Sequence, residues 1–161
     1  MPTRSSQARP RPNKVIRAAT PADVTGIASL VERYWESERI AGYHRPRIEV
    51  LLEQLLSAPD RGAIWVAATD AGPCGYLLAV FMFSLEHGGL MAEIDEIFVL
   101  PQMRLSGIGA LLLAAAERAM AARGLRRLQL QLGVENHRGR AFYFKRGFLA
   151  RAGYELLDKS L

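Results

Sequence analysis

The stretch Val99-Leu100-Pro101-Gln102-Met103-Arg104-Leu105-Ser106-Gly107-Ile108-Gly109-Ala110 joins two segments of different periodicity. Residues 93–99 predict a strand that stops at Pro101, because proline cannot donate a hydrogen bond to a sheet. After the stretch, apolar residues at helical spacing predict an amphipathic helix that runs to about Arg123. The residues expected on its apolar face are Ile108, Leu111, Leu112, Ala115 and Ala119.

A strand, a turn that contains Gly107 and Gly109, and a helix N-terminus together predict a site for an anion. The first amides of a helix have no acceptor within it, and the helix dipole favours negative charge there. Glycine lets a phosphate approach the backbone, and Arg104 adds a positive charge. The dinucleotide pattern G-x-G-x-x-G fails, because Leu112 occupies its third glycine position, and no Gly-Lys-Ser/Thr of a P-loop follows.

The pattern that remains, R-x-x-G-x-G, resembles the acetyl-coenzyme A pyrophosphate loop of the GNAT family of N-acetyltransferases. The common form of that loop is V-x-P-x-x-R-x-x-G-x-G/A-x-x-L, and it is matched here by Val99, Pro101, Arg104, Gly107, Gly109 and Leu112. The resemblance implies that acetyl-coenzyme A is the cosubstrate and that the loop binds its diphosphate. The implied binding residues are Arg104, Leu105, Ser106, Gly107, Ile108, Gly109 and Ala110.

Residues 136–148 resemble the second signature of the family, N-x-x-A-x-x-F/L-Y-x-x-x-G-F. The matching residues are Asn136, Phe142, Tyr143, Gly147 and Phe148, and Gly139 stands where alanine is usual. The resemblance implies that Asn136 contacts the pantetheine arm and that Arg146 meets the nucleotide phosphate. It also gives Tyr143 the role of the acid that protonates the departing thiolate. A phenol, with a pKa near ~10, can donate a proton at neutral pH without being ionised.

The predicted strand before the loop carries three acids, Glu93, Asp95 and Glu96. Because side chains alternate along a strand, we expect Glu93 and Asp95 on one face and Glu96 on the other. Acetyl transfer to an amine needs a base, since only the neutral amine attacks. Resemblance to histone-type relatives implies Glu93 as the base. Resemblance to polyamine-type relatives implies that Asp95 and Glu96 form an acidic pair that binds a cationic acceptor. We therefore expect Glu93 or Glu96 as the base, acting through water, with Asp95 attracting the cation.

Resemblance to the family also predicts where the pantetheine arm and the acceptor bind. The arm is expected to enter a gap beside the strand and to pair with the backbone of Ile97, Phe98 and Val99. The acceptor site is expected between the first two helices and the loop between strands. Segments in those positions contain Trp35, Tyr43, His44, Arg45, Glu86 and His87, of which Trp35 and Tyr43 are our candidates for acceptor contacts.

The remaining patterns complete the expected order of elements, β-α-α-β-β-β-α-β-α-β-β. Strands are predicted at 14–18, 63–69, 75–84, 93–99, 128–132, 148–150 and 154–157. Helices are predicted from Thr20 to about Arg39, at 46–56 with Leu51, Leu52, Leu55 and Leu56 inward, at 108–123, and from 136 to 146. This order predicts an α/β fold, a mixed, mostly antiparallel central sheet flanked by helices. It resembles the GNAT fold, which implies splayed central strands. We expect one acetyltransferase domain over residues 14–161 after a disordered basic, proline-rich tail, residues 1–13.

The composition excludes several classes of function. The net charge is +5, but Arg4, Arg9, Arg11 and Lys14 lie in the tail or directly after it, so the rest carries 17 basic against 16 acidic residues, or +1. A nucleic-acid partner is not expected, because the sequence has no basic stripe with interleaved aromatic residues, and a membrane partner is not expected, because no apolar run approaches the length that spans a bilayer. The single cysteine, Cys74, permits no internal disulfide and is expected in the core, and no residue cluster has metal-ligand spacing. Residues 1–14 have no apolar segment, so we expect a cytoplasmic protein. The oligomeric state stays open, and a homodimer is one of the states allowed.

We therefore predict an acetyl-coenzyme A-dependent N-acetyltransferase that acetylates the primary amine of a small, cationic acceptor by direct attack in a ternary complex. A polyamine, an amino acid or an aminoglycoside would fit. One alternative keeps the fold but acetylates a protein N-terminus or lysine. The other is a coenzyme-binding interaction module without catalysis.

Overall fold

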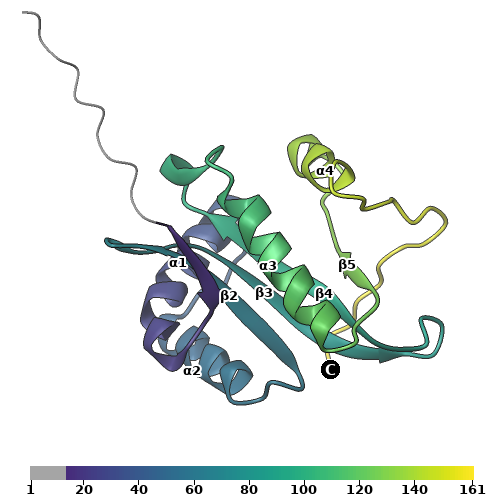
Figure 1. Cartoon of the computed structure of the whole chain (residues 1–161), viewed down its shortest axis with the longest axis horizontal. Coiled ribbons are helices and arrows are strands. Elements are labelled where there is room, and N and C mark those ends of the chain that lie inside the picture. The colour runs from purple at the N-terminus through teal and green to yellow at the C-terminus, as the bar shows by residue number, and fades with distance from the viewer. Residues whose placement is uncertain (1–13) are drawn as a thin grey trace, which may run out of the picture. The chain divides into compact units, whose positions relative to one another are not determined.

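The strands that precede the long helix form an antiparallel meander (Figure 1). We describe residues 14–161 from a computed structural model; the predicted tail, residues 1–13, lies outside the described residues. The strands are β1 (Val15–Ala18), β2 (Gly62–Thr69), β3 (Gly72–Ser84) and β4 (Gly89–Val99), each antiparallel to the next. The sheet order is β1-β2-β3-β4-β5, where β5 is Leu128–Leu130. The predicted hairpin between residues 75–84 and 93–99 is confirmed, and both of its strands are longer than expected.

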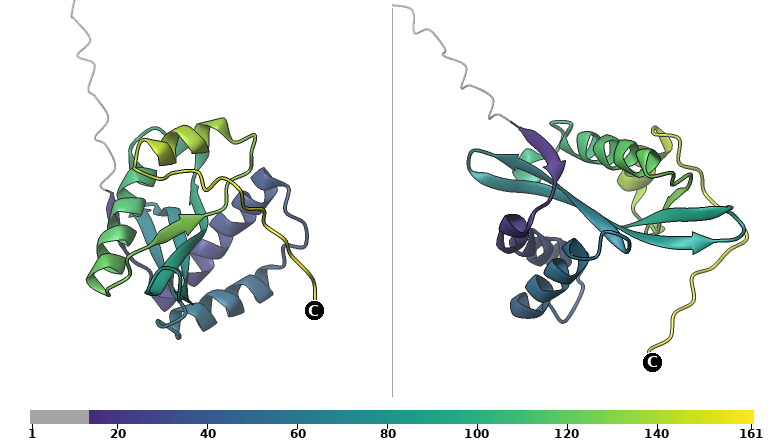
Figure 2. Two further views of the ribbon diagram at one scale, coloured as in Figure 1. Left: turned by 90° about the vertical axis from the view of Figure 1, so that its right-hand side faces the viewer. Right: turned by 60° about the horizontal axis from the view of Figure 1, so that its bottom comes forward.

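Helices cover both faces of this meander. A 3-10 turn, η1 (Pro21–Asp23), leads into α1 (Val24–Glu38), and α2 (Arg45–Leu56) follows. Both pack against one face, and α3 (Ile108–Ala122) lies across the opposite face (Figure 2). The predicted fold class, a mostly antiparallel sheet flanked by helices, is confirmed. The chain divides into two compact units, the first ending at Leu128 and the second spanning Gln129–Leu161.

The core under α1 and α2 follows the two periodicities of its elements. Alternate residues of β2, Ile64 and Val66, point to this face and meet the inward residues of α1. On α2 the expected apolar face was wrong at one position, because Leu51 is 47% exposed; Leu52 is buried as expected, and Ile48, which was not expected, is buried too. The buried members are Val24, Ile27, Ala28, Leu30, Val31, Ile48, Leu52, Ile64, Val66, Tyr76 and Phe98.

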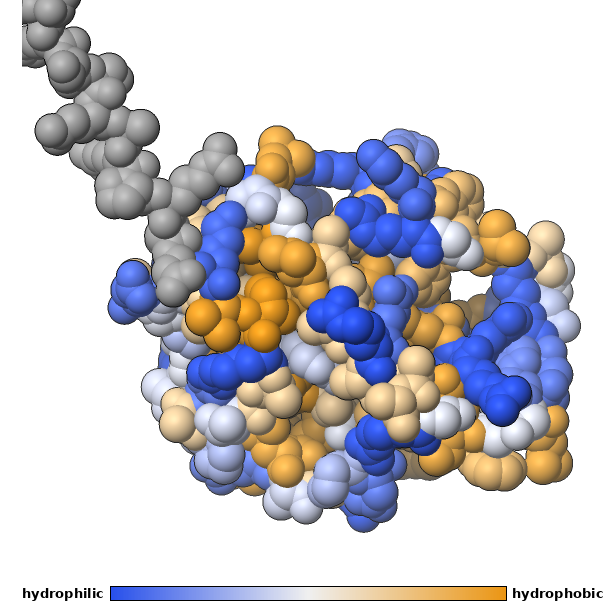
Figure 3. Space-filling view, viewed as in Figure 1, coloured by the Kyte–Doolittle hydropathy of each residue, from blue (hydrophilic) through white to orange (hydrophobic). Residues whose placement is uncertain are grey.

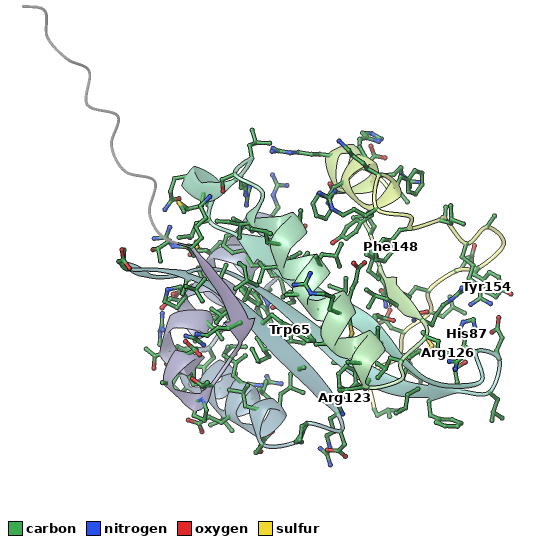
Figure 4. All side chains as sticks on the ribbon, in the orientation of Figure 1. Trp65, His87, Arg123, Arg126, Phe148 and Tyr154 are labelled. Carbon is green, nitrogen blue, oxygen red and sulfur yellow. The ribbon has the colours of Figure 1, made fainter. Side chains whose placement is uncertain are left out.

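The residues of α3 that face the sheet differ in part from those expected. Its buried residues are Ile108, Leu112, Leu113, Ala116 and Met120, whereas Leu111 is 49% exposed. Steps of four residues from Ile108 keep one side of a helix toward a flat partner, and this stripe faces the sheet. Trp65 of β2 lies on the α3 side of the sheet (Figure 4). On the outer surface of that side, apolar and charged residues are mixed (Figure 3).

The second unit contains one helix, α4 (His137–Phe144), within the described residues 129–161. The predicted strands at 148–150 and 154–157 are wrong, because these residues are irregular and Leu149 is 89% exposed. A strand needs a paired neighbour, and β5 contributes only Gln129 and Leu130 to this unit. Among residues 14–161 no helix is both long and apolar enough to cross a bilayer.

Candidate active site

The turn between β4 and α3 has the geometry of an anion-binding helix N-terminus. β4 ends at Val99, a 3-10 turn η2 (Pro101–Met103) follows, and α3 begins at Ile108. Helical bonding starts where the Leu111 amide donates to the Gly107 carbonyl, 3.0 Å away. The amides of Ile108, Gly109 and Ala110 precede that bond, so they have no acceptor within the helix. These amides can therefore donate to a bound anion.

Gly107 caps this helix in a conformation that other residues adopt at a cost. Its φ is +85°, in the left-handed region, and a Cβ built there would meet no protein atom within 4 Å. A side chain at this position would project into the open space beside the helix N-terminus. The sequence therefore places glycine where a ligand can approach the backbone.

Two cations lie at the same turn. The Arg104 Nε donates to the Val99 carbonyl at 3.0 Å, and its guanidinium lies 5.5 Å from the centre of the Phe98 ring, so this residue ties the loop to the end of β4. The Lys14 Nζ, from the chain just before β1, donates to the Ser106 carbonyl at 3.3 Å. Sequence reasoning counted Lys14 with the tail, because a contact across 92 residues leaves no local pattern.

A β-bulge interrupts the alternation of the acidic strand. Glu96 lies opposite Leu78 and Ile94 lies opposite Ala79, which leaves Asp95 as the extra residue between them. The expectation that Glu96 lies on the face opposite to Glu93 was therefore wrong, because one inserted residue reverses the alternation beyond it. Glu96 lies on the face that packs against α1, where the Trp35 side chain reaches it, and Glu93 shares that face.

The Glu96 carboxylate accepts hydrogen bonds from two aromatic side chains. Its Oε1 accepts from the Trp35 Nε1 at 2.7 Å, and its Oε2 accepts from the Tyr76 hydroxyl at 2.5 Å. Burial raises the pKa of the Glu96 carboxyl, the two hydrogen bonds lower it, and the charge of Asp95 raises it further. Sequence reasoning missed Tyr76, since a tyrosine within an apolar strand has the pattern of a core residue.

The neighbouring acids also act on one another. Desolvation raises the pKa of Asp95, and the charge of Glu93 raises it further. Carboxylates that repel one another are stabilised by a cation placed among them, and a carboxyl with a raised pKa accepts a proton more readily. This segment of β4 can therefore bind a cationic group and take a proton from it.

The expected acceptor residues Trp35 and Tyr43 are brought together. Their rings are 6.1 Å apart, edge to face, and the Tyr43 hydroxyl donates to the Ala28 carbonyl at 2.9 Å. Burial raises the pKa of Tyr43, so its hydroxyl stays protonated near neutral pH. Of the other candidates, Arg45 pairs with Glu32 at 2.9 Å, and His87 lies at the end of the β3–β4 hairpin (Figure 4).

The end of β4 offers backbone groups on two sides. Ile97, Phe98 and Val99 lie opposite Leu77, Tyr76 and Gly75 of β3. Because the amides and carbonyls of a strand alternate in direction, β3 can pair with only half of them, and the rest point away from β3. Those outward groups are the ones on which a pantetheine arm could pair.

In the second unit, Asn136 caps α4. Its Oδ1 accepts from the Gly139 amide at 2.7 Å. A Cβ built at Gly139 would lie 2.8 Å from both the Nδ2 and the Oδ1 of Asn136, so an alanine here would require the side chain of Asn136 to shift. The side chain of Asn136 is thus used by its own helix, and its contact with a pantetheine arm stays a prediction.

Tyr143 is nearly buried among aromatic rings. It is 7% exposed, with the Phe142 ring at 5.1 Å and the Phe148 ring at 5.2 Å. Burial raises the pKa of its hydroxyl to about 12, so the phenol keeps its proton. Arg146 donates to the Phe142 carbonyl at 2.7 Å and lies 3.7 Å from that ring's centre, and its phosphate contact stays a prediction.

Comparisons with known proteins agree with this geometry. The family described as "Acetyltransferase (GNAT) family" matches residues 27–148. The chain is 32% identical, over 130 residues, to an uncharacterized N-acetyltransferase of Archaeoglobus fulgidus, a match that covers 80% of this chain and 88% of the relative.

Solved structures are similar over almost the whole chain. An integron cassette protein from the mobile metagenome of Cole Harbour Salt Marsh has a TM-score of 0.79 and 28% identity, and the match covers 91% of this chain and 90% of that one. The aminoglycoside N-acetyltransferase AAC(6')-Iy, solved in complex with coenzyme A, has a TM-score of 0.81 and 22% identity, and the match covers 96% and 100%.

Proposed function

Because the chain belongs to the GNAT family of acetyltransferases, which use acetyl-coenzyme A, we propose that it acetylates the primary amine of a small, cationic acceptor. The observation that carries the choice of acceptor is the acidic segment of β4, where three carboxylates fall within four residues and where burial, and after it the charge of the neighbouring acid, raises the pKa of Asp95 and of Glu96. An ammonium group relieves that repulsion. A solved relative of the same fold is named for aminoglycosides, which are multiply charged amines, and this supports the proposal.

Acetyl-coenzyme A is the cosubstrate, and we assign its diphosphate to the turn before α3. The proposed donors are the amides from Leu105 to Ala110, with Arg104 beside them. Lys14, whose ammonium lies at the same loop, adds a second positive charge. The pantetheine arm is assigned to the outward backbone groups of residues 97–99, with Asn136 and Arg146 as further contacts.

The reaction that these groups would perform is a direct transfer. A proton moves from the acceptor's ammonium nitrogen to Glu93 or Glu96, through water where the distance requires it. The freed lone pair attacks the thioester carbonyl, the carbon–sulfur bond breaks, and the thiolate takes a proton from the Tyr143 hydroxyl. The second proton that the nitrogen loses as the amide forms passes through water to the Tyr143 oxygen and restores its hydroxyl. Because the Tyr143 phenol has a pKa of about 12 and a free thiol one near ~8.5, the phenol keeps its proton until the thiolate departs, stabilises the developing charge by a hydrogen bond, and transfers the proton only as the nitrogen's second proton replaces it.

The experiment that tests the function is a panel of amines incubated with the protein and acetyl-coenzyme A, following thiol release and product mass. Turnover of polyamines or aminoglycosides, with little turnover of neutral or acidic amines, supports the proposal. Release of thiol only with added peptides would instead indicate a protein acetyltransferase. Tight coenzyme binding with no acetylated product would indicate a non-catalytic module. A homodimer and a cytoplasmic location stay predictions of the sequence.

A further inference from the structure

The two donors on Glu96 come from elements that are far apart in the sequence. Trp35 is on α1, 61 residues before Glu96, and Tyr76 is on β3, 20 residues before it. Each carboxylate oxygen receives one of them, at 2.7 and 2.5 Å. A carboxylate oxygen has two lone pairs, so each oxygen keeps one with which to accept a further proton or hydrogen bond.

The chemistry of these donors favours the ionised carboxylate. An indole N–H only donates, and it donates more strongly to an ionised carboxylate than to a protonated carboxyl group. Tyr76 is fully buried, and burial together with the charge of Glu96 raises the pKa of its hydroxyl, which keeps it a donor. Protonation of Glu96 would therefore weaken both hydrogen bonds, because it removes the charge to which they are made.

We propose that Trp35 and Tyr76 are positioning residues that hold Glu96 ionised and fixed in orientation, so that Glu96, rather than Glu93, takes the proton from the acceptor's ammonium group. This inference rests on the proposed function and names the base within it. The nitrogen–hydrogen bond of the ammonium breaks and an oxygen–hydrogen bond forms on Glu96, while the nitrogen keeps the electron pair that attacks the thioester.

The pKa of Glu96 depends on the charged and titratable groups that surround Glu96 and Tyr76. Asp95, on β4 itself, raises the pKa of Glu96, as burial does, and Tyr76 from β3 and Trp35 from α1 lower it. Tyr34, from α1, raises the pKa of the Tyr76 hydroxyl. A base is most effective when its pKa is near the working pH, which a carboxyl reaches only if burial outweighs the donors. Removing one donor shifts this balance toward the protonated acid.

The two tryptophans of the chain allow this to be measured without catalysis. Trp65 lies on the opposite face of the sheet, so Trp65→Phe leaves Trp35 as the only tryptophan. Its fluorescence in the free protein should then titrate with Glu96. Adding Tyr76→Phe should move that midpoint up by about one pH unit, since a hydrogen bond to a charged group contributes roughly that much. The acidic limb of the kcat profile should move up with it.

Trp65→Phe alone is the matched control and should leave the acidic limb in place. Trp35→Phe should shift the acidic limb to higher pH, as Tyr76→Phe does, so either variant can serve for the test if the other is poorly folded. An unchanged fluorescence midpoint and an unchanged limb in Tyr76→Phe, with coenzyme binding retained, would overturn the inference. A shifted midpoint in a protein that acetylates no amine would support the role of the donors and count against the proposed function instead.

Discussion

Glu93 and Glu96 lie on the same face of β4, because Asp95 forms a bulge between them. Simple alternation would have separated the two glutamates by the thickness of the sheet. The bulge instead places both glutamates on the α1 side, where Trp35 and Tyr76 reach Glu96. Strands next to functional sites often carry such bulges, since they redirect side chains.

The two glutamates can be distinguished by their effect on the pH profile. Glu96→Gln should abolish the acidic limb and lower kcat by about 100-fold, because the proton acceptor is lost. Glu93→Gln should keep the acidic limb and shift its apparent pKa slightly lower, since the removal of Glu93 takes away one of the negative charges in this acidic segment, the one that acts on Asp95. The measurement is kcat against pH for both variants. A limb that disappears in Glu93→Gln and persists in Glu96→Gln would reverse the assignment.

Gly107→Val should weaken coenzyme A binding by about 100-fold, or about 2.7 kcal/mol, because the new side chain fills the space in front of the helix amides. Gly124→Val is the matched control. Gly124 also has a left-handed φ, +83°, with no neighbour near its Cβ, and it follows the other end of α3. Both variants should lose stability to a similar extent. Calorimetric titration with coenzyme A would contradict the loop assignment if the two dissociation constants changed alike.

Tyr143→Phe should lower kcat by about 100-fold and leave the dissociation constant of coenzyme A nearly unchanged, because the ring remains packed and only the acid is lost. Steady-state kinetics and calorimetry measure the two quantities. Tyr154→Phe, at an exposed tyrosine, is the control and should match the unaltered protein. An unchanged kcat in Tyr143→Phe would remove this residue from the mechanism.

Asp23 should make the free energy of unfolding depend on pH in the acidic range. The Arg17 guanidinium donates twice to its carboxylate, at 2.7 and 2.8 Å, and holds the pKa of Asp23 at about 2. Because the folded pKa is lower than the unfolded value, the stabilisation is full above about pH 4 and is lost as the pH falls toward 2. Asp23→Asn should cost about 1–2 kcal/mol at pH 7, discounted for the partial exposure of Arg17, and much less near pH 2.

Urea unfolding at both pH values checks this, with exposed Asp70→Asn as the control. An equal loss of stability for Asp23→Asn at pH 7 and at pH 2 would show that the pair does not titrate as described.

The sequence alone was enough to predict those elements whose formation depends on residues within one segment. The loop from Arg104 to Ala110 depends on local glycine and proline chemistry, and the elements before it follow clear periodicities. Features that depend on strand register could not be predicted. The pattern of alternating side chains does not indicate a one-residue bulge at Asp95, and Tyr76 meets Glu96 only because their two strands are paired. The closing strands were predicted from apolar alternation alone, which does not supply the neighbour that a strand needs.

The central claim is that backbone amides at the start of α3 bind the diphosphate of coenzyme A. A crystal structure of the protein soaked with coenzyme A tests it most directly. We expect diphosphate oxygens within about 3 Å of the amides of Ile108, Gly109 and Ala110, with Arg104 alongside. A structure in which coenzyme A is bound elsewhere, or in which side chains fill the space before Gly107, would contradict the account.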